Sequence, residues 1–350
     1  MSKPKIGFVG VGGMGQCAHL RNYASLDICE VVAISELRPE LGRRVAEKYG
    51  VPNIYPDAQT MLANEQLDGI VASQPFDRHG QIIAPLYQSG IPVFTEKPLA
   101  GNIAVGERLI HALSEGGSWH MVGYHKRSDP ATIVAKAEID RLKQTGELGA
   151  LKYVRISMPP GDWIAGGFYD MVHSGEQVPP MPPDPEPIDM DAETYGQYLS
   201  FVNYYIHQVN LLRHLFGANY EFTYADPSGV LVAAQSVEGI PGMIEMAAYQ
   251  TSIDWHETAL VTFERGYVRL ALPAPVALNR SGQVEFFRDP GNGTRPETII
   301  PALPWDHAMR QQARNFVLAI EGKIAPPCDA AEALEDLKAA RQYIRLWKGK

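Results

Sequence analysis

The first apolar segment of the chain reads Lys5-Ile-Gly-Phe-Val-Gly10-Val-Gly-Gly-Met-Gly15, a strand pattern that runs directly into a glycine-rich turn and then into a helical pattern. Glycines at these spacings permit a tight turn, close approach of the backbone to a pyrophosphate, and close packing of the helix on the strand. The helix N-terminus adds unpaired N–H groups that favour phosphates. Alone the pattern is a weak signal, because glycine-rich turns also occur without a ligand.

An acidic residue after the second apolar run strengthens this interpretation. Glu36 follows the run 30–35 and lies about 20 residues beyond Gly15, where the dinucleotide fingerprint places a carboxylate on the ribose hydroxyls. Such a carboxylate would repel a 2′-phosphate, so NAD is favoured over NADP, although Arg38 could soften that repulsion. The predicted cofactor-binding residues are Gly10, Gly12, Gly13, Met14, Gly15, Glu36, Glu96 and Lys97.

The first part of the chain, residues 1–125, alternates strand and helix patterns. The strand-like runs are 5–10, 30–35, 69–73, 92–95 and 120–124, and the helical stretches between them are 13–25, 39–49, 78–89 and 103–115. Alternation of this kind predicts βαβ units and a buried, mostly parallel sheet. We therefore predict an α/β fold that begins with a doubly wound, NAD-binding Rossmann domain.

The second part, residues 126–350, shows a different pattern. The expected helices are 129–146, 195–216, 307–321 and 329–347, and the expected strands are 151–158, 229–236, 242–251, 257–263, 267–272 and 283–287. Strands gathered in a block predict an α+β domain with a large, mostly antiparallel open sheet, whose last helix can pack back on the first domain. The stretch 159–191 carries six prolines between Pro179 and Pro187, which excludes a helix or a central strand there.

Composition excludes several classes of protein. With 350 residues, 45% hydrophobic content and a formal net charge of −9, the chain is neither disordered nor basic enough for nucleic acid or an anionic membrane surface. Its three cysteines suit neither a disulfide framework nor a metal site. No apolar run approaches the roughly 20 residues of a membrane span. We expect a cytoplasmic protein that binds no metal.

A lysine follows the fifth strand pattern, in Thr95-Glu96-Lys97-Pro98. In open parallel sheets, ligands bind beyond the carboxyl ends of the strands, near the point where the strand order reverses. An ammonium group placed there can polarise a carbonyl oxygen or relay a proton. The alternative is an ordinary surface lysine after a strand.

These features together resemble the glucose–fructose oxidoreductase / inositol dehydrogenase (Gfo/Idh/MocA) family. The resemblance is carried by the Gly10–Gly15 turn, the acid at position 36, Glu96-Lys97-Pro98, the segment 122–130 and the segment 327–336. It implies a Rossmann domain followed by an α+β domain whose open sheet supports a homodimer or homotetramer. It also implies oxidation or reduction, with NAD(P), of a secondary alcohol on a sugar, cyclitol or related polyol.

The resemblance also assigns a catalytic histidine. His207 falls on the histidine of the family and Asn203 falls on its aspartate, four residues earlier, where both side chains share one helical face. Imidazole exchanges protons near neutral pH, so His207 and Lys97 are expected to form a general acid/base pair. An amide at 203 orients the ring without adding charge. Three alternatives follow: His207 works with a lower pKa, the chemistry relies more on Lys97 and Tyr204, or the reaction is redirected.

Further residues are candidates for substrate binding. His125 and Arg127 are expected near the nicotinamide pocket, where arginine can bind an anionic or polyhydroxylated substrate; a solvated basic turn is the alternative. Trp163, with Asp162, Phe168 and Tyr169, could form a platform for a sugar ring, or could simply anchor a long loop. The predicted substrate-binding residues are Asn203, Tyr204, His125, Arg127 and Trp163.

Three functions remain open at this stage. The first is an NAD-dependent dehydrogenase that acts on a secondary hydroxyl of a sugar, glycoside or cyclitol. The second is a redox-neutral glycosidase, which oxidises the sugar transiently, eliminates the aglycone, adds water and returns the hydride. The third is a dinucleotide-binding sensor without catalytic activity.

Overall fold

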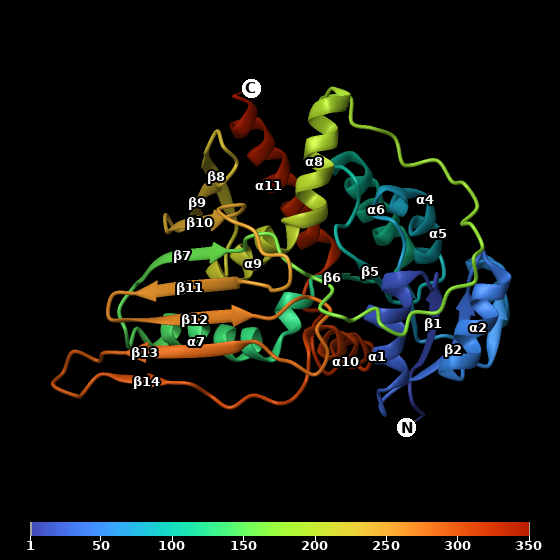
Figure 1. Ribbon diagram of the computed structural model, residues 1–350, viewed down its shortest axis with the longest axis horizontal. Helices are drawn as coiled ribbons and strands as arrows, with labels where there is room; N and C mark the ends of the chain where they lie inside the picture. The colour runs from blue at the N-terminus through green and yellow to red at the C-terminus, as the bar shows by residue number, and fades with distance from the viewer. Residues whose placement is uncertain (1, 350) are drawn as a thin grey trace. The chain divides into compact units, whose positions relative to one another are not determined.

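The computed structural model describes residues 2–349, which form two compact units (Figure 1). Unit 1 consists of residues 2–124, Gly166–Leu199 and Met309–Leu337, and unit 2 of the remaining described residues. A single division near residue 125 therefore does not describe this organisation, because the chain returns twice to unit 1. The physical reason is that Gly166–Leu199 and Met309–Leu337 contribute contacts to the core and surface of unit 1 that the first 124 residues do not make among themselves.

Unit 1 is built on a parallel sheet of six strands. The strands are β1 (Lys5–Val9), β2 (Glu30–Ser35), β3 (Asn53–Tyr55), β4 (Gly69–Ala72), β5 (Val93–Glu96) and β6 (His120–Gly123), in the spatial order β3-β2-β1-β4-β5-β6. The order reverses between β1 and β4, which is the point where a doubly wound sheet binds its ligand. Strands β4, β5 and β6 are buried along their whole length, as expected when helices cover both faces. The predicted Rossmann fold is confirmed.

The helices of unit 1 differ from the predicted pattern in two ways: α3 was not predicted, and the helix expected over 78–89 is interrupted. Their bounds are η1 (Gly15–Leu20), α1 (Arg21–Ala24), α2 (Pro39–Tyr49), α3 (Ala58–Asn64), η2 (Phe76–Arg78), α4 (His79–Ile82), α5 (Ala84–Tyr87), α6 (Ile103–Gly116) and α10 (Ala308–Ile320). The single helix expected over 78–89 is instead three short ones. Pro85 explains the interruption, because it lacks a backbone N–H and its ring crowds the preceding turn.

A late helix completes the core of unit 1. Phe316 of α10 is fully buried, with its ring centroid 5.7 Å from that of Phe94 and 6.4 Å from that of Tyr23. Ala313 and Val317 belong to the same buried cluster. Truncating a buried phenylalanine costs about 3–5 kcal/mol, so α10 is an integral part of this unit.

Unit 2 contains an open sheet of eight strands. The strands are β7 (Leu151–Ser157), β8 (Tyr220–Ala225), β9 (Leu231–Ser236), β10 (Pro241–Glu245), β11 (Glu257–Phe263), β12 (Gly266–Leu272), β13 (Gln283–Arg288) and β14 (Glu297–Ile299), in the order β14-β13-β12-β11-β7-β10-β9-β8. Neighbours pair antiparallel except β10 and β7, which are parallel. The predicted mostly antiparallel sheet is confirmed. The two edge strands, β8 and β14, were not predicted.

Helices cover one face of this sheet. Helix α7 (Pro130–Thr145) lies along β12 and β13, and α9 (Ile206–Phe216) packs on β7 and β10 (Figure 1). The helix expected over 195–216 is divided into α8 (Ala192–Tyr204) and α9 by an irregular turn at Tyr205. The last helix, α11 (Ala330–Lys348), contributes residues to both units, as does α8. Among residues 2–349, no helix combines the length and apolar character needed to cross a membrane.

Candidate dinucleotide and substrate sites

The turn after β1 has the geometry of a phosphate-binding loop. Gly10 has a φ of +83°, and a side chain there would collide with the amide of Gln74. A Cβ on Gly15 would lie 2.7 Å from the carbonyl oxygen of Gly10, so this close approach also requires glycine. At Gly12, by contrast, the nearest atom to an added Cβ is 3.8 Å away, on Arg38. The turn is therefore tight at both ends and open at Gly12.

Glu36 lies directly beside this turn. Its side chain is almost fully buried, and its carboxylate accepts a hydrogen bond of 2.9 Å from the backbone N–H of Val11. Arg38 donates to the same carboxylate through Nε at 2.7 Å and Nη2 at 3.1 Å. This bidentate pair fixes the orientation of both side chains.

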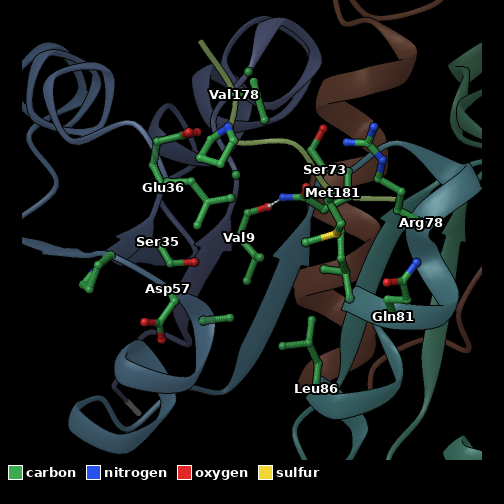
Figure 2. A pocket seen from close by; sticks show the side chains of 18 of the residues that line it. Val9, Ser35, Glu36, Asp57, Ser73, Arg78, Gln81, Leu86, Val178 and Met181 are labelled. Carbon is green, nitrogen blue, oxygen red and sulfur yellow. Dashed lines mark hydrogen bonds between the residues drawn. The ribbon is translucent and has the colours of Figure 1, made fainter. Parts of the chain in front are cut away.

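A cavity of about 770 Å³ opens between the ends of β1, β2 and β4 (Figure 2). It is lined by Val9, Gly10, Gly12, Ser35, Glu36, Arg38, Asp57, Ser73, Gln74, Arg78, Gln81, Leu86, Val178 and Met181, among others. Pockets for small ligands and cofactors span roughly 300–1,000 Å³ and combine apolar walls with a few polar groups. The open turn, the fixed carboxylate and the size of this cavity fit a dinucleotide.

The predicted cofactor residues are not all at this cavity. Gly10, Gly12 and Glu36 line it. Gly13, Met14 and Gly15 instead form the beginning of the helical segment that continues through η1 and α1. Glu96 and Lys97 lie at the end of β5, outside its lining.

Glu96 is buried and has a specific partner that the sequence analysis missed. Nε2 of His19 lies 2.7 Å from its carboxylate. Burial opposes ionisation of Glu96, but the hydrogen bond and charge of His19, together with the charge of Lys97, lower its pKa overall. The backbone N–H of Lys97 also donates to this carboxylate, and the peptide bond between Lys97 and Pro98 is cis. The contact fixes the backbone immediately before Lys97.

In unit 2, the three basic residues after β6 are buried rather than solvated. His125 packs its ring against that of His207, with centroids 4.4 Å apart and planes nearly perpendicular. Arg127 donates through Nε to the amide oxygen of Asn210 at 2.6 Å. These contacts overturn the alternative of a solvated basic turn, because each side chain is at most 6% exposed.

Lys126, the residue between His125 and Arg127 in the sequence, belongs to a buried ion pair. Lys126 donates to the carboxylate of Glu257, and both side chains are almost fully buried. Glu257 also accepts hydrogen bonds from Gln208 at 2.8 Å and from the indole of Trp255 at 3.1 Å. Because Gln208 is the next residue after His207, this network holds the start of α9 in place. The sequence signals none of these pairings, which join residues 131 and 49 positions apart.

The other predicted substrate residues lie in unit 2 but in different environments. Asn203 is exposed near the end of α8, whereas His207 is buried in α9 beyond the turn at Tyr205. The hydroxyl of Tyr204 accepts a hydrogen bond from the backbone N–H of Gly161, and burial raises the pKa of this hydroxyl. Trp163 is 36% exposed and is held through its backbone carbonyl by Val276.

The residues suggested for an aromatic platform fall in two different units. Trp163 and Asp162 belong to unit 2, whereas Phe168 and Tyr169 belong to unit 1. A second cavity, of about 530 Å³, lies within unit 2. Its polar and aromatic lining includes Asp162, Tyr249, Asp254, Trp255, His256, Glu257, Arg280 and Gln283. Within residues 2–349, no group of three or more His, Cys, Asp or Glu side chains is arranged to hold a metal ion.

Comparison with known proteins adds to this geometry. Residues 4–124 match the family model described as an oxidoreductase family with an NAD-binding Rossmann fold, the Gfo/Idh/MocA model. Residues 4–124 thus carry the NAD-binding domain of the Gfo/Idh/MocA family. The resemblance seen in the sequence is thus confirmed, and the matched residues contain the turn, Glu36 and Lys97.

Among curated proteins, the chain is similar to a myo-inositol 2-dehydrogenase of Thermotoga maritima. The two are 24% identical over 224 residues, which cover 64% of this chain and 58% of that enzyme. The match thus spans little more than half the length of this relative.

Two solved structures share the fold over nearly the whole chain. One is a putative NADPH-dependent oxidoreductase from Desulfitobacterium hafniense, with a TM-score of 0.76, 12% identity, and coverage of 100% of this chain and 97% of that one. The other is a levoglucosan dehydrogenase in complex with NADH and levoglucosan, with a TM-score of 0.72, 16% identity, and coverage of 99% and 98%. At these identities the comparison establishes the fold.

Proposed function

We propose that this chain is an NAD-dependent oxidoreductase that transfers a hydride between nicotinamide and a secondary hydroxyl, or the corresponding ketone, of a sugar, glycoside or cyclitol. The observation that carries the proposal is the cavity of about 770 Å³ bounded by the glycine turn and the buried Glu36. Inositol and levoglucosan dehydrogenases among the similar proteins support the substrate class. When bound, the nicotinamide accepts or donates the hydride.

NAD rather than NADP is the proposed cofactor. The carboxylate of Glu36 lines the cavity and would accept hydrogen bonds from ribose hydroxyls. Arg38 is the cation that a 2′-phosphate would require, and it is already paired with Glu36. A phosphate entering here would meet the Glu36 carboxylate and compete with it for Arg38.

Lys97 and His207 are proposed to handle the proton of the substrate alcohol. Lysine and histidine side chains both serve as general acids or bases in enzymes that work near neutral pH. Glu96 fixes the backbone before Lys97, and His125 and the Glu257 network fix α9 around His207. Rigid support of this kind is what acid/base catalysis requires of its neighbours.

The proposed substrate-binding residues are Asn203, Tyr204, His125, Arg127 and Trp163. The cavity of about 530 Å³ in unit 2, which none of these five residues lines, is a separate place where a polyhydroxylated ligand would fit, because carboxylates pair with hydroxyls and aromatic rings pack on apolar sugar faces. Arg127 would act through its bond to Asn210 rather than as an isolated cation. The sheet face opposite α7 and α9 carries half-buried apolar side chains, including Leu260, and supports a proposed homodimer or homotetramer.

One experiment separates the possible activities. Purified protein is mixed with NAD and a panel of free sugars, inositols and aryl glycosides, while NADH absorbance and aglycone release are followed together. Steady formation of NADH with a free polyol is the expected result. Aglycone release without net NADH would assign the redox-neutral glycosidase instead. NADH binding without turnover on any substrate would assign a sensor.

A further inference from the structure

The proline-rich segment between β7 and α8 is packed on unit 1 along most of its length. We call residues 166–186 the strap. Residues 171–186 contain neither helix nor strand, yet the whole strap clusters with unit 1 rather than with the adjoining residues of unit 2. A segment without its own hydrogen-bond ladder must be held by contacts to its neighbours. Those contacts fall into two groups, one on each side of the dinucleotide cavity.

The first group joins the strap to the helical segment after the glycine turn. The side-chain amide of Gln16, which is fully buried, donates to the carbonyl of Val172 at 3.1 Å and accepts from its N–H at 2.9 Å. Asp170 forms ion pairs with Arg21 and with Lys48, the latter at 2.9 Å. Burial opposes ionisation of Asp170, but the hydrogen bond of Lys48 and both cationic charges lower its pKa.

The strap also completes the beginning of α2. Arg38, the residue before this helix, does not cap it with its side chain. Instead, the carboxylate of Glu176 accepts the N–H of Leu41 at 2.9 Å and that of Glu40 at 3.3 Å. Free N–H groups and a partial positive charge at a helix N-terminus favour such a carboxylate. Glu176 thus anchors the strap on the Glu36 side of the cavity.

The second group lies on the opposite side, at α4. The carboxylate of Asp184, which is 5% exposed, accepts the N–H of Gly80 at 2.8 Å. Its own N–H donates to the carbonyl of Asp77 at 2.6 Å, and Gln81 donates to the carbonyl of Pro182 at 3.0 Å. The carbonyl of Pro185 accepts from Asn102 at 2.9 Å.

The residues between these anchors face the cavity. Val178, Pro179 and Met181 line it, opposite side chains from β1, β2 and α4 (Figure 2). The span from Glu176 to Asp184 also contains four of the six prolines, which limit the conformations available to it when detached. The span from Glu176 to Asp184 is therefore conformationally restricted and is attached on both sides of the dinucleotide cavity.

We propose that residues 178–181 form the outer wall of the dinucleotide site, and that the strap retains the cofactor by making its release depend on detachment of one anchor. This inference rests on the proposed function, because it concerns the same cavity. It assigns Asp170, Glu176 and Asp184 as positioning residues that act through the strap. It assigns Val178 and Met181 as residues that contact the bound dinucleotide.

The test measures release of NADH directly. Protein loaded with NADH is mixed with a large excess of NAD⁺, and loss of the bound fluorescence gives the dissociation rate. Asp170→Ala and Glu176→Gln are each expected to raise this rate about tenfold, and the double variant more, as for the loss of a charge-assisted contact. The control is Glu47→Gln, which alters an exposed ion pair on α2 that does not involve the strap.

A second measurement guards against misfolded variants. Hydrogen–deuterium exchange of peptides from 166–186 in the unaltered protein should slow when NADH binds, and Met181→Ala should weaken NADH binding with the anchors intact. If NADH binds but neither its release rate in the double variant nor strap exchange changes, the strap proposal is overturned and the proposed function stands. If the unaltered protein binds neither NADH nor NADPH, the proposed function fails and this inference fails with it.

Discussion

The ammonium of Lys126 and the carboxylate of Glu257 form an ion pair with side chains only 4% and 0% exposed. Two uncharged donors, Gln208 and the indole of Trp255, satisfy the remaining capacity of the carboxylate. Charges withdrawn from water this completely are tolerated only when each has partners. The pair links the residue after His125 to the first residue of β11, so it supports two proposed parts of the substrate site.

Removing one member of this pair should destabilise unit 2 strongly. Glu257→Gln leaves the Lys126 charge buried, and we expect a loss of about 3–5 kcal/mol in the free energy of unfolding. Urea denaturation measures it. The double variant Lys126→Met/Glu257→Gln should lose less than the two single variants combined. A loss below about 1 kcal/mol in Glu257→Gln would show that the pair is solvated in solution.

Asp129 should make stability depend on pH in the acidic range. Burial is the largest cause that raises its pKa, from 3.8 to about 6, although its carboxylate accepts N–H groups from Ala131 and Gly282. Between these values the folded protein binds the proton more tightly than the unfolded chain. The contribution of Asp129 to stability is therefore greatest below pH 4 and declines as pH rises towards 6.

Asp129→Asn tests this relationship, because an amide keeps the helix-capping acceptor of α7 without titrating. The free energy of unfolding of the variant, relative to the unaltered protein, should rise between pH 4 and pH 6 by up to about 3 kcal/mol. Parallel pH profiles for the two proteins would mean that Asp129 titrates normally.

Glu36 should control which dinucleotide binds. Glu36→Ser removes the charge that repels a 2′-phosphate and releases Arg38 to bind one. We expect the ratio of the NADPH and NADH dissociation constants to fall by at least about tenfold. Fluorescence titration measures both constants, and Glu47→Gln again serves as a control. An unchanged ratio would remove the basis for preferring NAD.

Lys97 and His207 should affect turnover far more than cofactor binding. Lys97→Ala and His207→Ala are each expected to lower kcat by about 10²- to 10⁴-fold, the usual contribution of a general acid or base. The dissociation constant of NADH should change much less. A variant that loses NADH affinity and turnover in parallel would indicate that the residue holds the cofactor instead.

Local sequence predicted the parts of the molecule that depend on local geometry. The glycine turn, Glu36 and most helices and strands follow from residue spacing and apolar period, so they were found without the structure. Contacts between distant residues were not. Gln16 meets Val172 and Leu41 meets Glu176 across more than 130 positions, and the prolines of the strap predicted only that it is irregular.

The sequence also did not predict which basic side chains are buried. The basic cluster at 125–127 was equally compatible with a solvated turn, because nothing nearby in the sequence reveals its partners Asn210 and Glu257. The helical pattern of the sequence continues through Tyr205, so the sequence predicts a single helix. The structure instead has two helices, separated at Tyr205.

The core of unit 1 has a consequence for synthesis of the chain. Phe316 fills a space beside Phe94 and Tyr23, yet it is translated more than 200 residues later than either. While unit 2 is being translated, part of the apolar surface of the parallel sheet stays exposed, because α10 has not yet been synthesised. We therefore expect the nascent chain to depend on chaperones up to the emergence of α10, and fragments ending before residue 308 to aggregate.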